Sequence, residues 1–242
     1  MALRGDLRVL WNLAFRRGRG ETHAERMASF YSGQASDYDA FRERLLHSRD
    51  ALYAKLPTPA GGVWLELGGG TAATLERLGD RLAALASVTV VDLAPALLAG
   101  AAARAKARGW SNVVTVEADV AAFRPARPAD VIAFSYSLTM IPDWFAAIDQ
   151  AISMLKPGGV LGVADFHVSR KHPEQGLARH GWTTRHGWPA WFATDNVHPS
   201  PDHLPYLRRR LDTVHLSEGR GKVPYLPFVR APYYVFIGRK PL

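Results

Sequence analysis

Short apolar runs alternate with helical patterns through the middle of the chain, and this alternation constrains the fold more than any other feature. Runs so apolar are typical of strands that are buried on both faces of a sheet. Because alternating strands and helices form parallel sheets with right-handed crossovers, we predict a doubly wound, mostly parallel α/β fold. Stop signals, such as Gly109 and the KPGG of residues 156–159, are expected to end two of the helices. The predicted strands are Val63–Leu67, Val88–Asp92, Val113–Glu117, Asp130–Tyr136 and Gly159–Asp165, and the predicted helices are Thr71–Leu85, Ala96–Arg108 and Trp144–Leu155.

The parts of the chain before and after this alternating pattern depart from it. After the fifth predicted strand, residues 167–211 form an irregular segment rich in Trp, His, Pro and Arg, where a doubly wound sheet needs only a helix. We therefore divide the chain into an N-terminal helical region, 1–57, and a main domain, 58–242, with an insertion at 167–211. The weaker predicted strands are Asp212–Ser217 and Tyr233–Arg239, and the N-terminal helical candidates are Leu3–Arg17, His23–Tyr31 and Asp37–Leu56.

The composition limits the classes of protein to which the chain can belong. The 242 residues carry a formal net charge of +8, which favours anionic partners. The chain has no cysteine, which excludes disulfides and thiolate zinc sites and favours the cytosol. No apolar run is long enough to cross a bilayer, and the N-terminal segment is too polar for a signal peptide, so we expect it to be retained. The histidine spacing fits neither a helical His pair nor HExxH, so no metal site is predicted.

A glycine-rich turn follows the first predicted strand, in the stretch VWLELGGGTAATLERL of residues 63–78. It matches G-x-G-x-x-A, in which Gly68 permits the tight turn and Gly70 lets a ligand approach the backbone. The pattern alone also fits an ordinary strand–helix connection. The next strand, however, ends in Asp92 about twenty residues later, where a carboxylate can bind ribose hydroxyls. The turn is therefore predicted to bind a nucleoside-containing cofactor.

Two further carboxylates favour S-adenosylmethionine over a dinucleotide. Glu66 lies directly before the glycines, where it can face the ammonium of a methionine moiety but would repel a pyrophosphate. Asp119 lies just past the third strand, where it can accept the proton of the adenine amino group, although it could equally cap a surface turn.

With the LKPGGVLGVAD of residues 155–165, these features resemble the class I S-adenosylmethionine-dependent methyltransferases over about residues 60–166. The resemblance implies a seven-stranded Rossmann-like sheet that binds S-adenosylmethionine at the carboxyl ends of its first strands. Tyr38 is expected to close over the cofactor and Arg49 to pair with its carboxylate. The full set of expected cofactor contacts is Tyr38, Arg49, Glu66, Gly68, Gly69, Gly70, Asp92, Leu93, Asp119, Val120 and Ser135.

Four stretches outside the predicted cofactor-binding motifs indicate a more specific family. DYDAFRERLLHSRD (37–50), FSYSLTMIPDW (134–144), WPAWFATDNVHPS (188–200) and VPYLPFVRAPYYVFIGRK (223–240) resemble the N-methyltransferases of betaine-lipid synthesis. That family trimethylates the amino group of diacylglyceryl-homoserine to give diacylglyceryl-trimethylhomoserine. The resemblance implies that a separate partner enzyme makes the diacylglyceryl-homoserine.

The candidate catalytic side chains lie at the ends of the fourth and fifth strands. Tyr136 ends the fourth strand, near where acceptors bind in this fold, although core packing would explain it equally well. Asp165 and His167 end the fifth, and His167 is the leading candidate for a general base because neutral imidazole is available near pH 7. Residues expected to contact the acceptor are Arg42, His47, Trp182, Trp188, Trp191 and Arg209, with ordinary packing or solvation as the alternative for each.

A lipid acceptor has to be reached at a membrane surface. Leu3, Leu7, Leu10 and Trp11 recur at helical spacing among five arginines, as in a basic helix that lies in an anionic interface. The same pattern fits a helix packed on the protein's own core. We expect a cytoplasmic protein that is peripheral on the inner face of the membrane.

Other functions stay open at this point. The acceptor can be a phospholipid such as phosphatidylethanolamine, or a small amine. The chain can instead be a non-catalytic cofactor-binding scaffold. A nucleic-acid methyltransferase is disfavoured because SYSLTMIPDW lacks the Asn/Asp-Pro-Pro-Tyr/Phe pattern and no RNA-binding module is apparent. The repulsion between Glu66 and a pyrophosphate argues against an NAD oxidoreductase. The sequence does not predict an oligomeric state.

Overall fold

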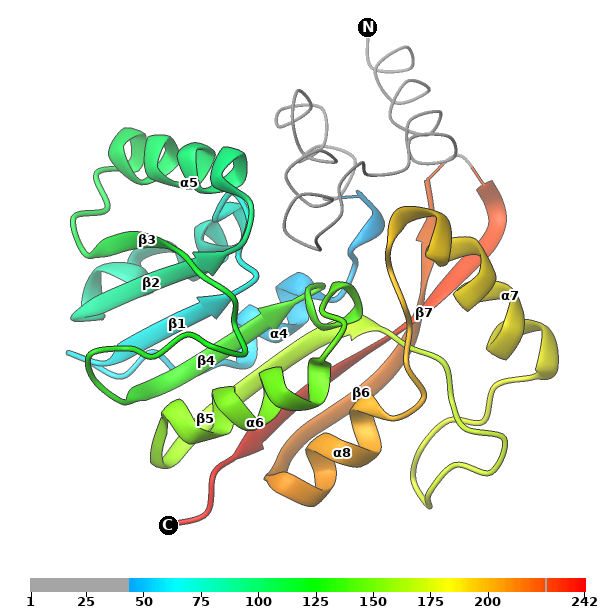
Figure 1. The fold of residues 1–242 in the computed structure, drawn as a ribbon. Coiled ribbons are helices and arrows are strands. Elements are labelled where there is room, and N and C mark those ends of the chain that lie inside the picture. The colour runs from blue at the N-terminus through cyan, green and yellow to red at the C-terminus, as the bar shows by residue number, and fades with distance from the viewer. Residues whose placement is uncertain (1–43, 225) are drawn as a thin grey trace, which may run out of the picture.

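One mixed sheet of seven strands organises the molecule (Figure 1). The structure is a computed structural model that describes residues 44–224 and 226–242. The first five strands are parallel to one another, and the last two run antiparallel at one edge. In sheet order the strands are β3 (Val113–Glu117), β2 (Ser87–Asp92), β1 (Val63–Leu67), β4 (Ala129–Ser135), β5 (Leu155–Phe166), β7 (Leu226–Arg239) and β6 (Asp212–Val223).

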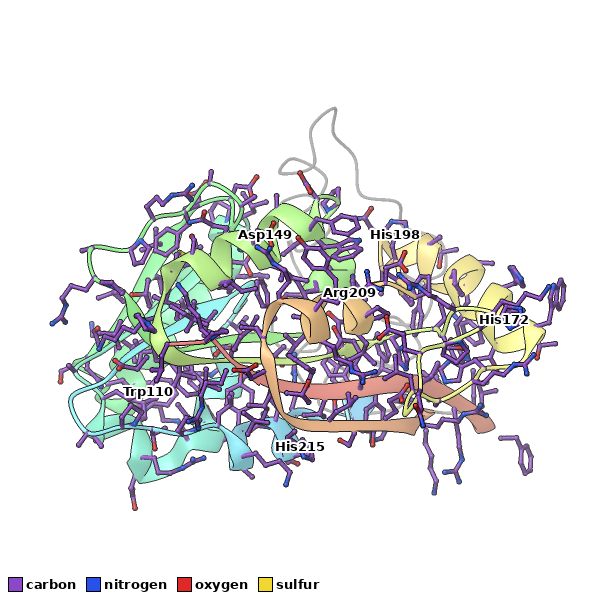
Figure 2. All side chains as sticks on the ribbon, turned by 90° about the horizontal axis from the view of Figure 1, so that it is seen from below. Trp110, Asp149, His172, His198, Arg209 and His215 are labelled. Atoms are coloured by element: carbon purple, nitrogen blue, oxygen red, sulfur yellow. The ribbon has the colours of Figure 1, made fainter. Side chains whose placement is uncertain are left out.

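Helices cover both faces of this sheet (Figures 1 and 2). Strand alternation divides β1 between two cores: Trp64 packs with the α4 side, and Leu65 and Leu67 pack with the α6 and α8 side. Asp149 on α6 and Arg209 on α8 mark the second face in Figure 2. The helices and 3-10 segments are α4 (Arg49–Lys55), η1 (Ala73–Ala84), α5 (Pro95–Arg108), η2 (Leu138–Met140), α6 (Trp144–Met154), α7 (Trp182–Phe192), η3 (Ala193–Asp195) and α8 (His203–Arg210).

The strand order reverses beside β1, and this reversal determines where a ligand can bind. β1 pairs with β2 on one side and β4 on the other, so the crossovers leave β1 in opposite directions. In open α/β sheets the crevice at the carboxyl ends of such strands is the binding site. The glycine-rich turn after β1 lies in that crevice.

The antiparallel edge extends the sheet past this crevice. Phe166, the last residue of β5, pairs with Tyr233, whereas β7 already begins at Leu226. The tip of the β6–β7 hairpin therefore projects beyond the carboxyl end of β5. The insertion that the sequence predicted at 167–211 contains α7, η3 and α8, and α7 lies beside this tip (Figure 1).

Most strand predictions are confirmed, and β1 and β3 agree to the residue. The expectation of burial on both faces is wrong for β3, because it is the edge strand and none of its residues is fully buried. The KPGG of residues 156–159 does not separate α6 from β5. It lies inside β5 as an irregularity, where the register moves from Ala129↔Leu155 to Val131↔Val160.

Two helix predictions also need correction. The segment after the glycine turn is a 3-10 helix, kinked at Gly79, whose φ of 53° and ψ of −136° are not helical. In the described part of the predicted helix Asp37–Leu56, the helix is interrupted before Arg49, so α4 is only seven residues long. Leu3–Arg17 and His23–Tyr31 lie outside the described residues, so the boundary at residue 57 stays a prediction. No helix in residues 44–224 or 226–242 has the length and apolarity to cross a membrane.

Gly162 lets α4 pack directly on β5, and this contact is testable. A Cβ at Gly162 would lie 2.7 Å from Leu56 Cδ2 and 2.9 Å from Leu52 Cδ1, both fully buried side chains. We expect Gly162→Ala to lower the free energy of unfolding by about 1–3 kcal/mol through overpacking. Gly187→Ala in α7 meets no atom within 4 Å and should be neutral or stabilise by up to about 1 kcal/mol. Urea denaturation measures both, and an unchanged midpoint for Gly162→Ala would contradict this packing.

Candidate functional site

Glycine is required for a different physical reason at each of the three positions after β1. A Cβ on Gly68 would lie 2.4 Å from Ser137 Cβ, and a Cβ on Gly69 would lie 2.7 Å from Glu66 Cγ and Val90 Cγ1. Gly70 has a φ of +55° and an open face, whose nearest atom is Leu97 Cδ1 at 3.7 Å. Neighbouring side chains therefore require the first two glycines, and the third leaves backbone exposed to a ligand. This open face fits the predicted cofactor.

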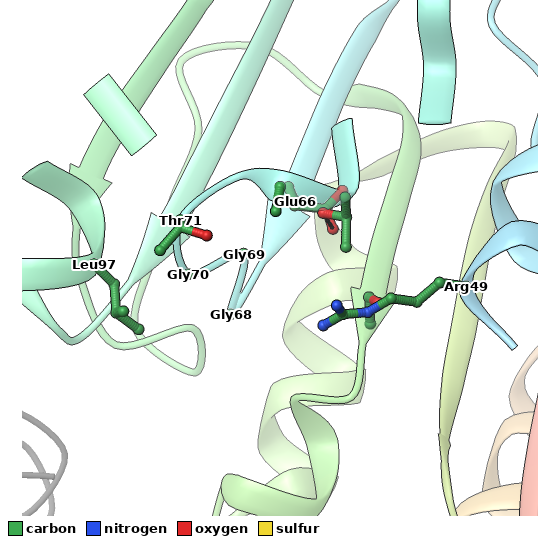
Figure 3. Close-up of a pocket in the computed structure, with 10 residues that line it drawn as sticks. Arg49, Glu66, Gly68, Gly69, Gly70, Thr71 and Leu97 are labelled. Atoms are coloured by element: carbon green, nitrogen blue, oxygen red, sulfur yellow. Dashed lines mark hydrogen bonds between the residues drawn. The ribbon is translucent and has the colours of Figure 1, made fainter. Parts of the chain in front are cut away.

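A pocket opens over this turn, with about 400 Å³ of space including its mouth. Figure 3 shows Arg49 on one side of the glycine turn and Leu97 on the other. One cation and one carboxylate line the pocket, as the amino-acid end of S-adenosylmethionine requires. The lining residues are Arg49, Glu66, Gly68, Gly69, Gly70, Thr71, Ala73, Thr74, Leu97 and Ser135.

Glu66 is fully buried and holds three elements together. Its carboxylate accepts hydrogen bonds from the Tyr53 hydroxyl of α4, from Trp64 Nε1 at 3.0 Å and from Thr74 Oγ1 at 3.2 Å. Burial raises the pKa of Glu66 and also that of Tyr53. Because a carboxylate has about four acceptor sites, three protein donors leave it room for about one more. The sequence predicted the ligand contact but missed this structural role, since it depends on Tyr53.

Asp92 holds the glycine turn from the side of β2. Its Oδ2 accepts a hydrogen bond from the Gly70 N–H at 2.8 Å, and its Oδ1 accepts one from Ala94 N–H at 2.9 Å. Asp119 is exposed, and its Oδ1 accepts from Ala121 N–H at 2.9 Å, as in the turn-capping alternative. Both aspartates follow neighbouring strands at the same sheet edge. Asp92, Leu93, Asp119 and the buried Val120 are not among the residues that line the described pocket, so their cofactor contacts stay predictions.

The start of α4 meets the end of β4 beside the pocket. Arg49 is 7% exposed and its Nε donates a hydrogen bond to Ser135 Oγ at 3.1 Å. The Tyr136 hydroxyl and Ser48 Oγ are hydrogen-bonded at 2.7 Å, and the Arg49 guanidinium lies 5.9 Å from the Tyr136 ring centroid. The structure thus brings together three predicted site residues, Arg49, Ser135 and Tyr136. It adds Ser48, which the sequence marked only by its place beside Arg49.

Tyr136 adopts an unusual backbone conformation. Its φ of 56° is in the left-handed region, which bulky residues rarely adopt. Its N–H donates to the Ala164 carbonyl at 2.7 Å, so the end of β5 holds it in place. Burial raises the pKa of its phenol well above the usual value, so the hydroxyl stays protonated at neutral pH. Such strain is a recurrent property of functional sites.

A continuous row of rings leads from Tyr136 to α7. Tyr136 meets Phe166 edge-on at 4.8 Å between centroids, and Phe166 stacks on Phe192 at 4.6 Å. Trp188 stacks on Phe192 at 5.1 Å and on Trp191 at 5.5 Å. We call these five residues the aromatic ladder. Of the tryptophans predicted to contact the acceptor, Trp188 and Trp191 belong to the ladder. Trp182 lies at the start of α7 and is 69% exposed.

Asp165 and His167 lie at the end of β5, as the sequence predicted, but their side chains are buried. Asp165 is fully buried, and its oxygens accept hydrogen bonds from Thr139 N, Thr139 Oγ1 and Phe166 N at 3.1, 2.7 and 2.8 Å. His167 contacts Tyr234, whose core lies on the α6 and α8 face, whereas Tyr136 packs in the core on the α4 face. Both residues lie at the predicted carboxyl end of β5, but strand alternation directs them to the face opposite the Tyr136 ring. The charge of Asp165 still acts on the Tyr136 phenol and helps to raise its pKa. The catalytic roles of Asp165 and His167 stay predictions.

His167 instead belongs to a buried polar cluster. Its Nε2 lies 2.8 Å from Glu218 Oε1 of β6. The rings of His180 and Tyr234 lie 5.0 and 5.5 Å away, and His203 is 6.4 Å from Tyr234. Burial lowers the pKa of His180 to about 4 and that of His203 to about 3, so both are neutral at pH 7. In the described chain no group of three or more His, Asp or Glu could hold a metal ion.

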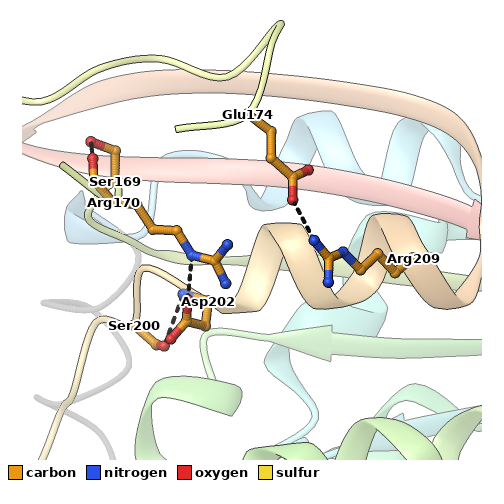
Figure 4. Close-up of polar contacts among 6 residues, drawn as sticks. All are labelled: Ser169, Arg170, Glu174, Ser200, Asp202 and Arg209. Carbon is orange, nitrogen blue, oxygen red and sulfur yellow. Dashed lines mark hydrogen bonds and ion pairs between the residues drawn. The ribbon is translucent and has the colours of Figure 1, made fainter. Parts of the chain in front are cut away.

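Two further predicted substrate residues, His47 and Arg209, are not among the residues that line the pocket. Nε2 of His47 is 2.7 Å from the Lys222 carbonyl, which ties the segment before α4 to β6. Arg209 on α8 points to Glu174, with Nη2 and Oε1 3.5 Å apart (Figure 4). Its side chain is 74% exposed, so the solvated alternative fits Arg209. Tyr38 and Arg42 lie outside the described residues.

The comparisons with known proteins agree with this geometry. A family model described as a methyltransferase domain matches residues 38–216. Trans-aconitate 2-methyltransferase from Enterobacter sp. (strain 638) is 38% identical over 79 residues, which are 33% of this chain and 29% of that protein. The matched stretch therefore spans less than a third of that relative.

Solved structures share the fold. N-methyltransferase NodS from Bradyrhizobium japonicum WM9, in complex with S-adenosyl-L-homocysteine, has a TM-score of 0.60 at 19% identity, over 85% of this chain and 98% of that one. Phosphoethanolamine N-methyltransferase 2 from Haemonchus contortus has a TM-score of 0.70 at 12% identity, over 92% of this chain and 61% of that one. At these identities the likeness establishes the shared fold.

Asp92 offers a direct test of the cofactor site. We expect Asp92→Ala to weaken S-adenosylmethionine binding about tenfold or more, because it removes an acceptor at the ribose position and releases the Gly70 N–H. Isothermal titration calorimetry measures the affinity. Asp212→Ala, an exposed aspartate at the start of β6, is the matched control and should bind normally. Unchanged affinity in Asp92→Ala would contradict the assigned position of the cofactor.

The buried histidines predict acid sensitivity. The unfolded chain binds protons at an ordinary histidine pKa of about 6.5, whereas folded His203 and His180 bind them only near pH 3 and 4. Their contribution to the free energy of unfolding is therefore complete above about pH 6.5 and declines as the pH falls toward 4. We expect His203→Phe to flatten this decline in urea denaturation at pH 7.5, 6, 5 and 4, while His186→Gln in the exposed part of α7 should not. Parallel pH profiles for His203→Phe and the unmodified chain would contradict this assignment.

Proposed function

The chain belongs to the class I S-adenosylmethionine-dependent methyltransferases, and from that premise we propose that it is an N-methyltransferase whose acceptor is the amino group of diacylglyceryl-homoserine. The proposed product is the trimethylated betaine lipid. The acceptor then comes from a separate enzyme that attaches the homoserine moiety to diacylglycerol.

One observation carries this proposal: the four stretches that resemble the betaine-lipid enzymes gather at one place in the fold. Ser48 of the first stretch binds Tyr136 of the second. The second stretch also accepts a 2.7 Å hydrogen bond at Thr139 O from His198 N of the third. Trp188 of the third packs in one apolar cluster with Val229 of the fourth. Residues as far apart in the sequence as Ser48 and Val229 thus lie around the carboxyl ends of β4 and β5, where the acceptor of a class I methyltransferase has to bind.

The chain's own groups can hold the cofactor's amino-acid end. S-adenosylmethionine supplies an electrophilic methyl group on a sulfonium, so the enzyme needs no covalent intermediate. Arg49 is placed to pair with the carboxylate, and Glu66 has about one acceptor position left for the ammonium. The open backbone at Gly70 and the Asp92 carboxylate are on the side of the pocket toward Leu97, where the nucleoside would lie. Because donors and acceptors are fixed by buried contacts, they orient the methyl group before the acceptor arrives.

The surroundings of Tyr136 suit an amine that becomes a quaternary ammonium. Aromatic faces stabilise such cations by about 0.5–2 kcal/mol each, and Tyr136 is followed by Phe166 and Phe192. The Tyr136 phenol is protonated at neutral pH, so it can orient the amine through a hydrogen bond but cannot serve as a base. The amine must lose a proton before each transfer, and we propose that water accepts it. Orientation and exclusion of solvent then supply most of the acceleration.

A phospholipid or small-amine acceptor is the alternative. It is favoured by the likeness to the phosphoethanolamine N-methyltransferase fold, which has the higher TM-score of the two N-methyltransferases described above. The two acceptors differ in the headgroup carboxylate, which only homoserine carries.

The proposal can be tested with purified protein, S-adenosylmethionine and mixed micelles. We expect mass spectrometry to show diacylglyceryl-homoserine gaining three methyl groups, with little transfer to phosphatidylethanolamine. The reverse preference would favour the alternative. Cofactor binding without transfer to either lipid would favour a scaffold.

Tyr136 links this activity to the described site. Tyr136→Ala removes a ring from the proposed ammonium environment and should lower kcat/KM for the lipid about tenfold or more. Tyr206→Ala is a matched control, because the Tyr206 hydroxyl is also hydrogen-bonded to a side chain, donating to Asp149 Oδ1 at 2.8 Å, but lies on α8. We expect its kcat/KM to stay near that of the unmodified chain. Equal losses in the two variants would contradict a specific role for Tyr136.

A further inference from the structure

Exposed aromatic side chains gather at the end of the molecule formed by α7 and the β6–β7 hairpin tip. Trp182 and Trp191 on α7 are 69% and 46% exposed, and Phe228 in the hairpin is 96% exposed. The only other described aromatic ring of comparable exposure is Phe145 on α6, at 47%. α7 and the hairpin adjoin each other, since Trp188 and Phe192 pack in one cluster with Val223 and Val229 (Figure 1). Soluble proteins rarely expose a group of large aromatic side chains at one place unless a partner binds there.

The charge of this end is uniformly basic. Residues 179–192, RHGWTTRHGWPAWF, and residues 220–230, RGKVPYLPFVR, contain no aspartate or glutamate, although the whole chain has 22 acidic residues. Lys222 pairs with Arg230 across the hairpin, and both are exposed. The basic residues of the two segments are Arg179, Arg185, Arg220, Lys222 and Arg230.

We propose that this aromatic–basic end, residues 179–192 with 220–224 and 226–230, docks on a bilayer that carries anionic lipids. Tryptophan and phenylalanine beside Arg and Lys are typical of elements that lie in the headgroup region. The charge complements an anionic surface, where each basic residue adds to the attraction. The proposal rests on a lipid acceptor, as proposed above, and it identifies how that acceptor is reached.

The geometry connects this end with the reaction site. The hairpin tip projects past the carboxyl end of β5, which is the edge where the cofactor pocket opens. The aromatic ladder runs from Trp191, exposed on α7, through Trp188, Phe192 and Phe166 to Tyr136. The inner rings of this ladder are buried, so the ladder is a packed connection that fixes the position of the exposed end relative to Tyr136.

The test is co-sedimentation of the full chain with phosphatidylglycerol-containing vesicles and with pure phosphatidylcholine vesicles. We expect binding to the anionic vesicles that falls about tenfold or more in Trp182→Ser/Trp191→Ser/Phe228→Ser and in Lys222→Glu/Arg230→Glu. Phe145→Ser and Arg124→Glu/Arg127→Glu, which are exposed positions elsewhere, are the controls and should bind normally. Retained binding in both patch variants would overturn the proposal and point to the N-terminal segment as the anchor.

A second measurement locates the contact without loss of apolar surface. Brominated lipids in the anionic vesicles should quench the tryptophan fluorescence of the unmodified chain, and Trp182→Phe/Trp191→Phe should lose most of this quenching while it still binds. Quenching unchanged in that variant would overturn the proposal.

The two proposals fail separately. Vesicle binding that depends on the patch, without methylation of any lipid amine, would refute the acceptor and leave the docking surface standing. Methylation of a short-chain, micellar acceptor by patch variants that also keep vesicle binding would refute the docking surface and leave the acceptor standing.

Discussion

The buried Glu66 carboxylate is the interaction on which the site depends. It receives hydrogen bonds from Tyr53 of α4, from Trp64 of its own strand and from Thr74 of η1. A charge removed from water is tolerated only when donors replace its hydration, so these three groups have to stay where they are. The glycine turn lies between Glu66 and Thr74, and Arg49 belongs to the same short helix as Tyr53. One carboxylate therefore fixes the turn, the adjacent helix and the cation that faces the pocket.

Local sequence patterns correctly predicted the strands and the turn that carry this site. The apolar run, the glycines and the spacing to Asp92 are all contained in a short stretch of sequence, and they placed β1, the turn and β2 correctly. The contacts of Tyr53 with Glu66 and of Ser48 with Tyr136 join segments 13 and 88 residues apart. No local periodicity encodes such pairs, because they arise only once α4 is packed on the sheet.

The difference at His167 has a simpler cause. His167 and Asp165 share one side of the chain at the end of β5, and Phe166 between them points to the other, so alternation alone separates them from Tyr136. This alternation can be seen in the sequence, but the prediction assigned all the polar residues near the ends of two strands to one site. On the face opposite the Tyr136 ring, His167 lies beside Glu218 of β6 and Tyr234 of β7, at the antiparallel edge of the sheet.

The reversed direction of β7 has a geometric consequence. A parallel strand at that position would begin at the amino-terminal edge of the sheet, away from the pocket. Because β7 runs antiparallel, its first residues rise above the same edge from which the glycine turn opens. If that rim touches a flat surface, the edge at which the glycine turn opens is the edge nearest to that surface. The polarity of a single strand would thus set the orientation in which the whole molecule approaches its substrate.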